Sequence, residues 1–291
     1  MMKKFLSMAL VAVCVTLLSC DEDDDQKLSS EQSKAVEDQS ATEAYFNEAG
    51  DLSTQALSSP EDEQISGGRT KENITITVEG DTRFNGATVT LTVGPNNNAL
   101  NPQGTITIDF GAGQTDPNGT VRKGKILVAY NGWRFLPGSK IELTFQGYEV
   151  NGVKLEGKRT VTTTALAQNS ITFEVKDEGG KATFTDGTFV TREALHTSKW
   201  TIGNSAATTT WTLEGSANGQ TRERQPYTAT VQSPIIFKLE CTLSSFVAPA
   251  QGVLALTVGT TAIQVDYGTG TCDNKATVTV GGFSQEITIG E

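Results

Sequence analysis

Ile106-Thr107-Ile108-Asp109-Phe110 alternates apolar and polar residues, and this pattern decides the fold class. Successive side chains of a β-strand point to opposite faces, so the stretch presents its apolar residues to one side. A strand with one apolar and one polar face is typical of antiparallel sheets. The same period of two recurs from residue 73 onward, at 74–78, 89–93, 126–130, 141–145, 171–175, 235–239, 254–258, 263–267 and 278–280.

Turn residues separate these runs. Asn118-Gly119, Asn131-Gly132 and Asn151-Gly152 favour two-residue hairpin turns, because Asn and Gly adopt positive φ at low cost. Roughly fourteen strands at this spacing indicate an all-β fold, either an antiparallel β-sandwich or an elongated β-meander. We expect no helix of ordinary length after residue 70.

An internal similarity suggests two β subdomains. Residues 106–116 resemble residues 263–273, since both contain a strand that ends in Asp, then an aromatic residue and a Gly-x-Gly turn. We therefore predict β subdomain 1 at 71–165 and β subdomain 2 at 166–291, with a continuous sheet as the alternative. Independent use of the same turn chemistry explains the similarity equally well.

The first 19 residues have the pattern of a lipoprotein signal peptide. Lys3 and Lys4 precede an apolar stretch at 5–18. A membrane-spanning helix requires roughly 20 apolar residues, so this stretch fits the hydrophobic region of a signal peptide better. Leu17-Leu18-Ser19-Cys20 follows and resembles a lipobox, in which the cysteine thiol accepts a diacylglycerol. We predict lipidation at Cys20 and attachment to a membrane; an ordinary signal peptide with a cysteine at its end is the alternative.

The negative charge of the protein is concentrated behind Cys20. Residues 21–63 contain fourteen acidic residues and two lysines, whereas residues 65–291 contain 20 acidic and 19 basic residues. The net charge of −11 therefore belongs almost wholly to the N-terminal segment. Because the rest of the chain has no basic excess, we expect no nucleic-acid partner.

Residues 20–70 are predicted to form a lipidated acidic tether, either with a short helix or as a disordered spacer. Ala41, Tyr45, Ala49, Leu52 and Ala56 have helical spacing, although Gly50 interrupts them. Residues 64–70, with a Gly-Gly pair, are expected to be a linker.

The acidic run at 21–25 is similar to the surface-export signal of Bacteroidetes lipoproteins. This resemblance implies a protein of the outer membrane, with its domain exposed at the cell surface. A solvated run that only keeps the junction extended is the alternative.

A set of short segments spread over most of the mature chain carries a further resemblance. These are 44–46, 106–111, 118–119, 122–126, 150–152, 157–162, 266–268, 272–274 and 276–278, together with Phe145 and Tyr148. With these segments the chain resembles a family of uncharacterised secreted Bacteroidetes lipoproteins. The resemblance implies the location and the β architecture but no chemistry.

Two cysteines remain in the mature domain. Cys14 lies in the segment that is removed, which leaves Cys241 and Cys272 in an oxidising compartment. Cys241 continues the apolar row of Ile235 and Phe237 and should point inward. We predict a disulfide between Cys241 and Cys272, because two thiols without nearby histidines do not make a metal site.

No catalytic motif accompanies the single histidine, His196, which we interpret as a surface residue. We expect no enzyme activity and no cofactor, and the Gly-x-Gly turns lack the helix of a dinucleotide site. An envelope hydrolase remains an alternative, because a glycosidase needs only two suitably spaced carboxylates.

Two further groups are weaker candidates for ligand binding. Tyr130, Trp133 and Phe135 surround an Asn-Gly turn and would stack on a sugar ring if exposed, although core packing of Tyr130 and Trp133 is the plainer explanation. Turn residues offer oxygens to calcium, although Asx residues in turns usually bind local backbone amides. The calcium candidates are Asp109, Asp116, Asn118, Asp266, Asp273 and Asn274.

These observations predict a non-enzymatic, lipid-anchored envelope protein with a binding or structural role. Its partners would be the membrane and a glycan or an envelope protein. A carbohydrate-binding accessory lipoprotein is the first alternative, and an envelope hydrolase is the second.

Overall fold

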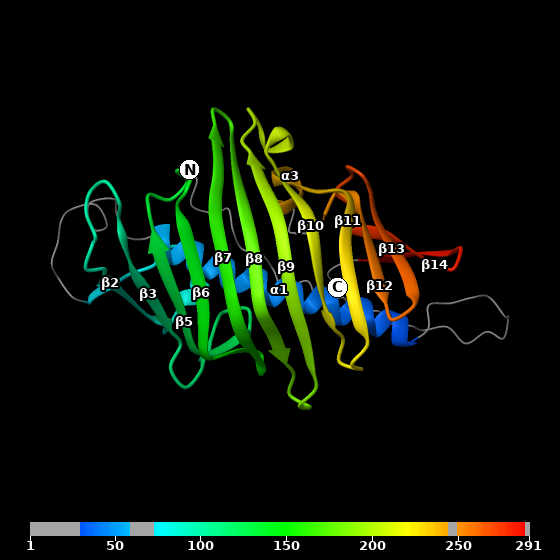
Figure 1. Ribbon diagram of the computed structural model, residues 1–291, viewed down its shortest axis with the longest axis horizontal. Coiled ribbons are helices and arrows are strands. Elements are labelled where there is room, and N and C mark those ends of the chain that lie inside the picture. Colours follow the sequence, from blue (N-terminus) through cyan, green and yellow to red (C-terminus); the bar gives the residue numbers. More distant parts are fainter. Residues whose placement is uncertain (1–29, 59–72, 244–248, 289–291) are drawn as a thin grey trace. The chain divides into compact units, whose positions relative to one another are not determined.

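The computed structural model describes residues 30–58, 73–243 and 249–288 (Figure 1). The predicted signal peptide, Cys20, the acidic run and the linker at 64–70 lie outside these residues. The described chain forms two compact units. Unit 1 comprises residues 45–58, 73–166 and 173–189, and unit 2 comprises residues 30–44, 167–172, 190–243 and 249–288.

Unit 1 is an antiparallel β-meander. Its strands lie in the order β1-β2-β3-β5-β6-β7-β8, and the short β4 pairs with β5 (Figure 1). A short 3-10 helix, η1 (Thr82–Phe84), precedes β2. The bounds of these strands are β1 Ile74–Ile76, β2 Thr88–Val93, β3 Gln103–Asp109, β4 Gln114–Thr115, β5 Val121–Asn131, β6 Lys140–Val150, β7 Val153–Ala167 and β8 Ser170–Thr183.

Unit 2 has the same type of topology. Its strands follow the order β9-β10-β11-β12-β13-β14-β15, again with antiparallel neighbours. The all-β antiparallel prediction is confirmed, and within each unit the order is that of a meander. The bounds are β9 Phe189–Thr201, η2 Ala206–Thr208, β10 Thr210–Gln220, β11 Pro226–Lys238, α3 Leu239–Leu243, β12 Gln251–Val258, β13 Thr261–Thr269, β14 Lys275–Val280 and β15 Phe283–Thr288.

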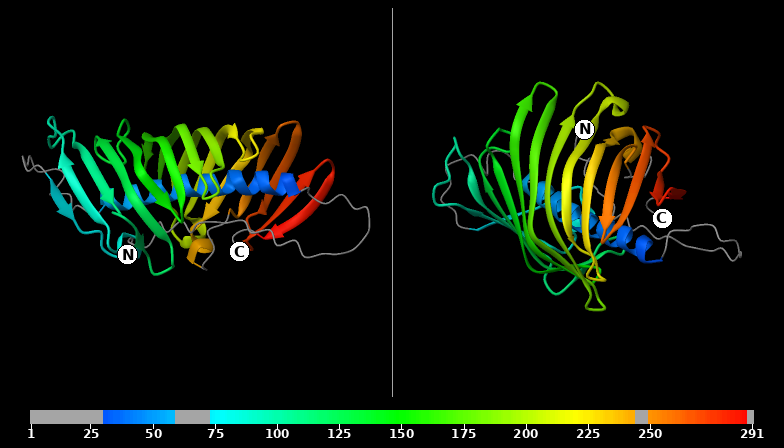
Figure 2. Two further views of the ribbon diagram at one scale, coloured as in Figure 1. Left: turned by 90° about the horizontal axis from the view of Figure 1, so that it is seen from below. Right: turned by 45° about the vertical axis from the view of Figure 1, so that its right-hand side comes forward.

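Helix α1 (Ser30–Ser58) contributes to both units and is longer than the sequence suggested. In unit 1 it lies on one face of the strands, as both views of Figure 2 show. Gly50 does not interrupt it. An interior glycine costs about 1 kcal/mol relative to alanine, and packing of the helix against the strands offsets that cost. The helical spacing of the apolar residues between Ala41 and Ala56 therefore corresponds to a helix packed on the strands and not to a disordered spacer.

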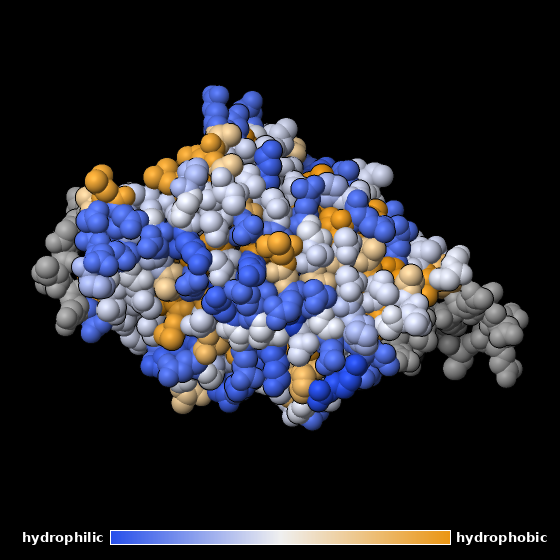
Figure 3. Space-filling view, in the orientation of Figure 1, coloured by the Kyte–Doolittle hydropathy of each residue, from blue (hydrophilic) through white to orange (hydrophobic). Residues whose placement is uncertain are grey.

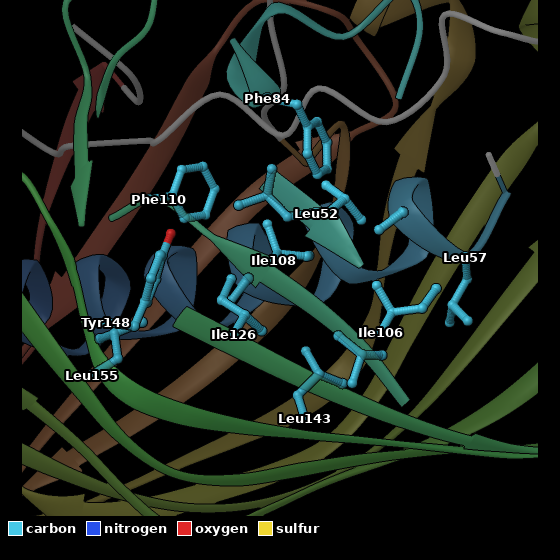
Figure 4. Close-up of a cluster of buried hydrophobic side chains, with 14 of the residues drawn as sticks. Leu52, Leu57, Phe84, Ile106, Ile108, Phe110, Ile126, Leu143, Tyr148 and Leu155 are labelled. Atoms are coloured by element: carbon cyan, nitrogen blue, oxygen red, sulfur yellow. The ribbon is translucent and has the colours of Figure 1, made fainter. Parts of the chain in front are cut away.

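The core of unit 1 combines the alternating rows of the strands with the last turns of α1 (Figure 4). Phe46 and Leu52 of the helix are fully buried in the same cluster as Ile106 and Ile108 of β3. Fully burying one such side chain contributes about 1.5–3 kcal/mol. The period of two in the strands thus creates the apolar surface that holds the helix.

The face of the unit 1 strands that α1 does not cover is charged. Lys158 of β7 and Glu178 of β8 lie 3.0 Å apart, and Lys176 approaches the same carboxylate at 2.8 Å. These side chains alternate with inward-facing residues of the same strands, which is the expected consequence of the pleat. Figure 3 shows many hydrophilic residues on the side of the strands turned toward the viewer.

The disulfide lies in unit 2. Cys241 and Cys272 have their sulfur atoms 2.02 Å apart and their Cα atoms 5.2 Å apart. Cys241 is buried, as predicted, but it does not continue strand β11. The strand ends at Lys238, and Cys241 belongs to the short helix α3, so strand parity was the wrong reason for its inward position.

Among the described residues, the structure contains no helix that is both long and apolar enough to cross a membrane.

Candidate functional site

The two Gly-x-Gly turns use their aspartates in the same way. Asp109 Oδ1 accepts a hydrogen bond of 2.8 Å from the backbone N–H of Gly111, and Asp266 Oδ1 accepts one of 2.8 Å from Gly268. Asp109 also lies 2.7 Å from Lys125 Nζ, and its hydrogen bonds to Lys125 and Gly111 lower its pKa. The internal similarity of the sequence therefore corresponds to a shared hydrogen bond, although β3 ends at Asp109 whereas β13 continues to Thr269.

The remaining calcium candidates also bind nearby groups. Asp116 Oδ1 accepts from the backbone N–H groups of Asn118 and Thr120, and its Oδ2 lies 2.7 Å from Arg122 Nη1. Asp273 Oδ1 accepts a bond of 3.3 Å from the backbone N–H of Lys275. In the described part of the chain, no three His, Cys, Asp or Glu side chains come together in a way that suits a metal ion.

The three aromatic candidates do not form one exposed surface. Tyr130 is only 7% exposed and belongs to the core of unit 1, where burial raises its pKa to about 12. Trp133 is half-buried, and its Nε1–H donates to the carbonyl of Ala99 at 3.0 Å. Phe135 packs edge-on against Phe173, with ring centroids 6.1 Å apart. Only Trp133 and Phe135 retain partial exposure.

His196 is buried, which corrects the prediction of a surface histidine. Only 6% of it is exposed, and it lies opposite Gly215 on the neighbouring strand β10. Val190, Arg192 and Ala194 precede it with the same parity and are also buried. His196 is therefore one member of an inward-facing row of β9.

A set of buried ion pairs between α1 and the strands was not anticipated. In unit 1, Arg122 of β5 donates from Nε to Glu48 Oε1 at 3.1 Å, and its Nη2 also contacts that oxygen. Its Nη1 binds Asp116 at 2.7 Å. All three side chains are at most 5% exposed. One guanidinium thus joins a helix carboxylate to a turn carboxylate inside the unit.

A second buried pair lies one helical turn further along α1. Arg83 of η1 is bound at 2.5 Å by Asp51 of the helix and at 2.5 Å by Asp81, the residue that caps η1. Burial raises the pKa of Asp51 to about 7, although Arg83 acts in the opposite direction. Burial alone would lower the pKa of Arg83, but the two carboxylates outweigh it and leave that pKa raised.

A third pair lies within the strands and touches the helix. Arg159 of β7 donates to both carboxylate oxygens of Asp177 on β8, at 2.6 and 2.9 Å, and its Nη1 donates to Asn47 Oδ1 at 2.9 Å. Its guanidinium carbon also lies 5.7 Å from the ring centre of Phe46. Arg134 lies in the turn after β5, and its Nη1 donates a hydrogen bond of 3.3 Å to the carbonyl oxygen of Thr54 near the end of α1.

Unit 2 contains the same type of contact with the first half of α1. Asp38 accepts a bond of 3.2 Å from the backbone N–H of Arg222 and lies 3.8 Å from its Nη1. Burial raises the pKa of Asp38 to about 6, with Arg222 acting against it. Arg192, whose side chain is fully buried, lies 3.6 Å from Glu43. We call these contacts in both units the helix-docking pairs: Glu48–Arg122, Asp51–Arg83, Asn47–Arg159, Asp38–Arg222 and Glu43–Arg192.

The sequence contains a signal for the helix-docking pairs. Arg122 shares the parity of Ile126, Val128 and Tyr130, and Arg192 shares that of Val190. A charged residue in an apolar row of a strand has to be paired, because burying an isolated charge is very unfavourable. The partners are the acidic residues of α1, in the segment predicted to be an acidic tether with a short helix or a disordered spacer.

A hollow near these groups bears on the hydrolase alternative. A shallow hollow in unit 1 is lined by Val121, Lys123, Glu149 and Gly152. Its only carboxylate, that of Glu149, lies 2.8 Å from Lys123 Nζ. A single ion-paired carboxylate does not provide the two carboxyl groups that glycoside hydrolysis requires.

Comparison with known proteins provides no relative for this chain. No protein-family model matches it, and neither a curated protein nor a solved structure matches it.

Proposed function

We propose that this chain is a lipid-anchored protein of a bacterial outer membrane, exposed at the cell surface. Its β units bind a partner or act as a scaffold and do not catalyse a reaction. The observation that carries the proposal is the Leu17-Leu18-Ser19-Cys20 junction at the end of a short apolar stretch. The acidic run behind it, and the resemblance to Bacteroidetes lipoproteins, support the surface location. Two or more acyl chains on one cysteine are sufficient for stable anchoring.

The positions of the charged groups support a role without catalysis. The buried arginines of unit 1 bind carboxylates that fix α1 and the strands. These carboxylates are at most 5% exposed, so a substrate does not reach them. The exposed charges on the opposite face form cross-strand pairs, such as Lys158 with Glu178, and are typical of a solvated surface.

A carbohydrate ligand has weaker support than a protein or scaffold role. Stacking on a sugar ring needs an exposed aromatic face, and Tyr130 has no such face because it packs in the core. Trp133 is half-buried and its indole N–H is already bound to Ala99. A hydrolase has less support still, for the reasons given for the hollow at Glu149.

Lipidation is tested with two cysteine variants of the full-length protein in its host. Cys20→Ala should abolish incorporation of labelled palmitate and release the protein from the membrane fraction. Cys14→Ala is the matched control, because it also removes a thiol from the N-terminal segment but leaves the junction intact. Failure of the wild-type protein to incorporate palmitate would contradict the proposal, as would equal membrane attachment of Cys20→Ala.

Surface exposure needs a separate test. Protease added to intact cells should degrade the wild-type protein while a periplasmic marker survives. Protection of the protein until the cells are broken would refute the surface location and leave the lipid anchor unaffected.

A further inference from the structure

Strand β15 is the last strand of unit 2, and one of its edges has no strand partner among the described residues. Its bounds are Phe283–Thr288, and it pairs with β14 through a two-residue turn, Gly281-Gly282. Figure 1 shows this C-terminal hairpin in red. Unpaired backbone groups along a strand edge are a template for pairing with another chain.

The turn determines which backbone groups of β15 are available. Gly281 and Gly282 have φ values of 58° and 89°, which is the signature of a type I′ turn. The turn hydrogen bond directs the backbone N–H of Phe283 toward β14, opposite Val280. Hydrogen-bonded and non-hydrogen-bonded residues alternate along an antiparallel pair. The backbone groups of Ser284, Glu286 and Thr288 therefore point to the open edge.

The side chains of β15 give its open edge little protection. Phe283, Gln285 and Ile287 face one side and are half-buried, and none of them is charged. Within the strand there is no proline, and Glu286, the one charged residue, is already paired with Lys275 at 2.6 Å. By contrast, the first strand of unit 1, β1, is only three residues long. Short edge strands are one of the usual protections against pairing.

We infer that β15 is a self-association strand, which pairs antiparallel with β15 of a second copy of this chain around a two-fold axis at Gln285. Residues opposite one another must point to the same face, so only registers that pair residues of equal parity are allowed. With Gln285 opposite its counterpart, Phe283 lies opposite Ile287 and Ser284 lies opposite Glu286. This register pairs an apolar residue with an apolar residue and a carboxylate with a hydroxyl.

The neighbouring registers of equal parity are less favourable. If the axis moves one residue toward the C-terminus, Glu286 lies directly opposite Glu286 of the second copy, and like charges in that position are destabilising. If it moves one residue toward the turn, fewer residues of β15 overlap. An interface of one short strand is smaller than the roughly 1,200 Å² of a stable complex, so the dimer is expected to be reversible.

Cysteine cross-linking in the full-length protein tests this register. Residues in a non-hydrogen-bonded pair have Cα atoms about 4.5 Å apart, which lies within the range of disulfides. Gln285→Cys should therefore give a disulfide-linked dimer on non-reducing gels of cell envelopes. In the proposed register Thr288 is separated from its counterpart by about six residues, or about 20 Å. Thr288→Cys should give at least about tenfold less dimer, since that distance exceeds disulfide reach.

A second pair of variants separates loss of pairing from loss of folding. Ser284→Pro removes an N–H that faces the open edge, and should abolish cross-linking of Gln285→Cys while the denaturation midpoint of the protein stays unchanged. Gln285→Pro, in a protein without the introduced cysteine, removes an N–H that faces β14 and should lower that midpoint. The wild-type protein controls for dimers formed through its native cysteines. Absence of dimer from folded Gln285→Cys would overturn the inference, as would equal dimer from Thr288→Cys.

Discussion

Arg122 and Glu48 are joined by a hydrogen bond of 3.1 Å from Nε to Oε1, although 74 residues separate them in sequence. The contact connects β5 to α1 inside unit 1, and neither side chain is more than 5% exposed. A buried ion pair is weak evidence for net stabilisation, because removing both charges from water is costly. Loss of one partner, in contrast, leaves the other charge uncompensated. The helix-docking pairs therefore fix the position of α1 more than they add to the total free energy of unfolding.

We predict that Glu48→Ala destabilises the protein by about 3 kcal/mol, since breaking a buried pair typically costs about 3–5 kcal/mol and Arg122 retains Asp116. Chemical denaturation of the purified protein measures this change. Lys140→Ala is the control, because it breaks the exposed pair with Glu142 and should leave the midpoint almost unchanged. Similar effects of the two variants would show that the buried pair has no special role.

Asp51 should make the stability of the protein depend on pH. Its pKa is about 7 in the folded protein and 3.8 for the free side chain, so the folded state binds the proton more tightly. Its contribution to the free energy of unfolding is therefore fully present below about pH 4 and is lost as the pH rises through about 7. The groups that face it are Arg83, Asp81, Glu48 and Arg134.

Asp51→Asn tests this dependence, because the amide cannot titrate. Denaturation at several pH values between 4 and 8 should show that the wild type loses stability relative to Asp51→Asn as the pH rises. Glu174→Gln, at an exposed position of β8, is the control and should follow the wild type. If the stability of the wild type and that of Asp51→Asn change in parallel with pH, protonation of Asp51 does not contribute to the stability of the folded protein.

The sequence predicted the strands because their signal is local. Ile106, Ile108 and Phe110 are fully buried, as their alternation required. Asn151-Gly152 forms the predicted two-residue hairpin turn, because Val150 pairs with Val153. Asn118-Gly119 and Asn131-Gly132 lie in longer connections, which corrects the prediction for those two pairs. The choice between sandwich and meander depended on how strands pair over long distances. Alternation cannot determine this, because it fixes the face of each residue and not its neighbour in the sheet.

The docking of α1 was harder to predict because the buried face of the helix contains acidic residues. Phe46 and Leu52 mark an apolar stripe, but Glu48 and Asp51 are also buried on the sheet side of the helix. Acidic residues in a strongly acidic segment normally indicate exposure. The information lay instead in the strands, at arginines that share the parity of apolar residues. The same signal is present for His196, which shares the parity of the buried Val190 and Ala194.

The disulfide of unit 2 should contribute measurably to stability. Cys241 and Cys272 are 31 residues apart, and closing a loop of this length stabilises a protein by about 3–4 kcal/mol in the chain-entropy model. Reductant should lower the denaturation midpoint of the wild type. It should have no effect on the Cys241→Ser/Cys272→Ser double variant, which should already be destabilised. If the wild type is also insensitive to reductant, the bond contributes nothing to stability.

Two glycines in one bulge between β5 and β6 should respond differently to the same substitution. The register of the two strands shifts between Lys123 and Lys125. Gly124 and Gly147 have φ values of 74° and 60°, both unfavourable for alanine. A Cβ on Gly124 would come within 2.1 Å of the backbone oxygen of Gly147, whereas a Cβ on Gly147 would meet nothing within 4 Å.

Gly147→Ala should therefore cost about 1 kcal/mol, from backbone strain alone. Gly124→Ala should cost more than about 3 kcal/mol, because the strand next to it has to move as well. Thermal or chemical denaturation of the two variants measures the difference. Since they share the bulge, the backbone preference and the added methyl group, only the contact with the facing strand distinguishes them. Equal losses of stability would mean that β5 and β6 separate at the bulge without cost, and that the close approach of Gly124 to Gly147 does not hold the register of these strands.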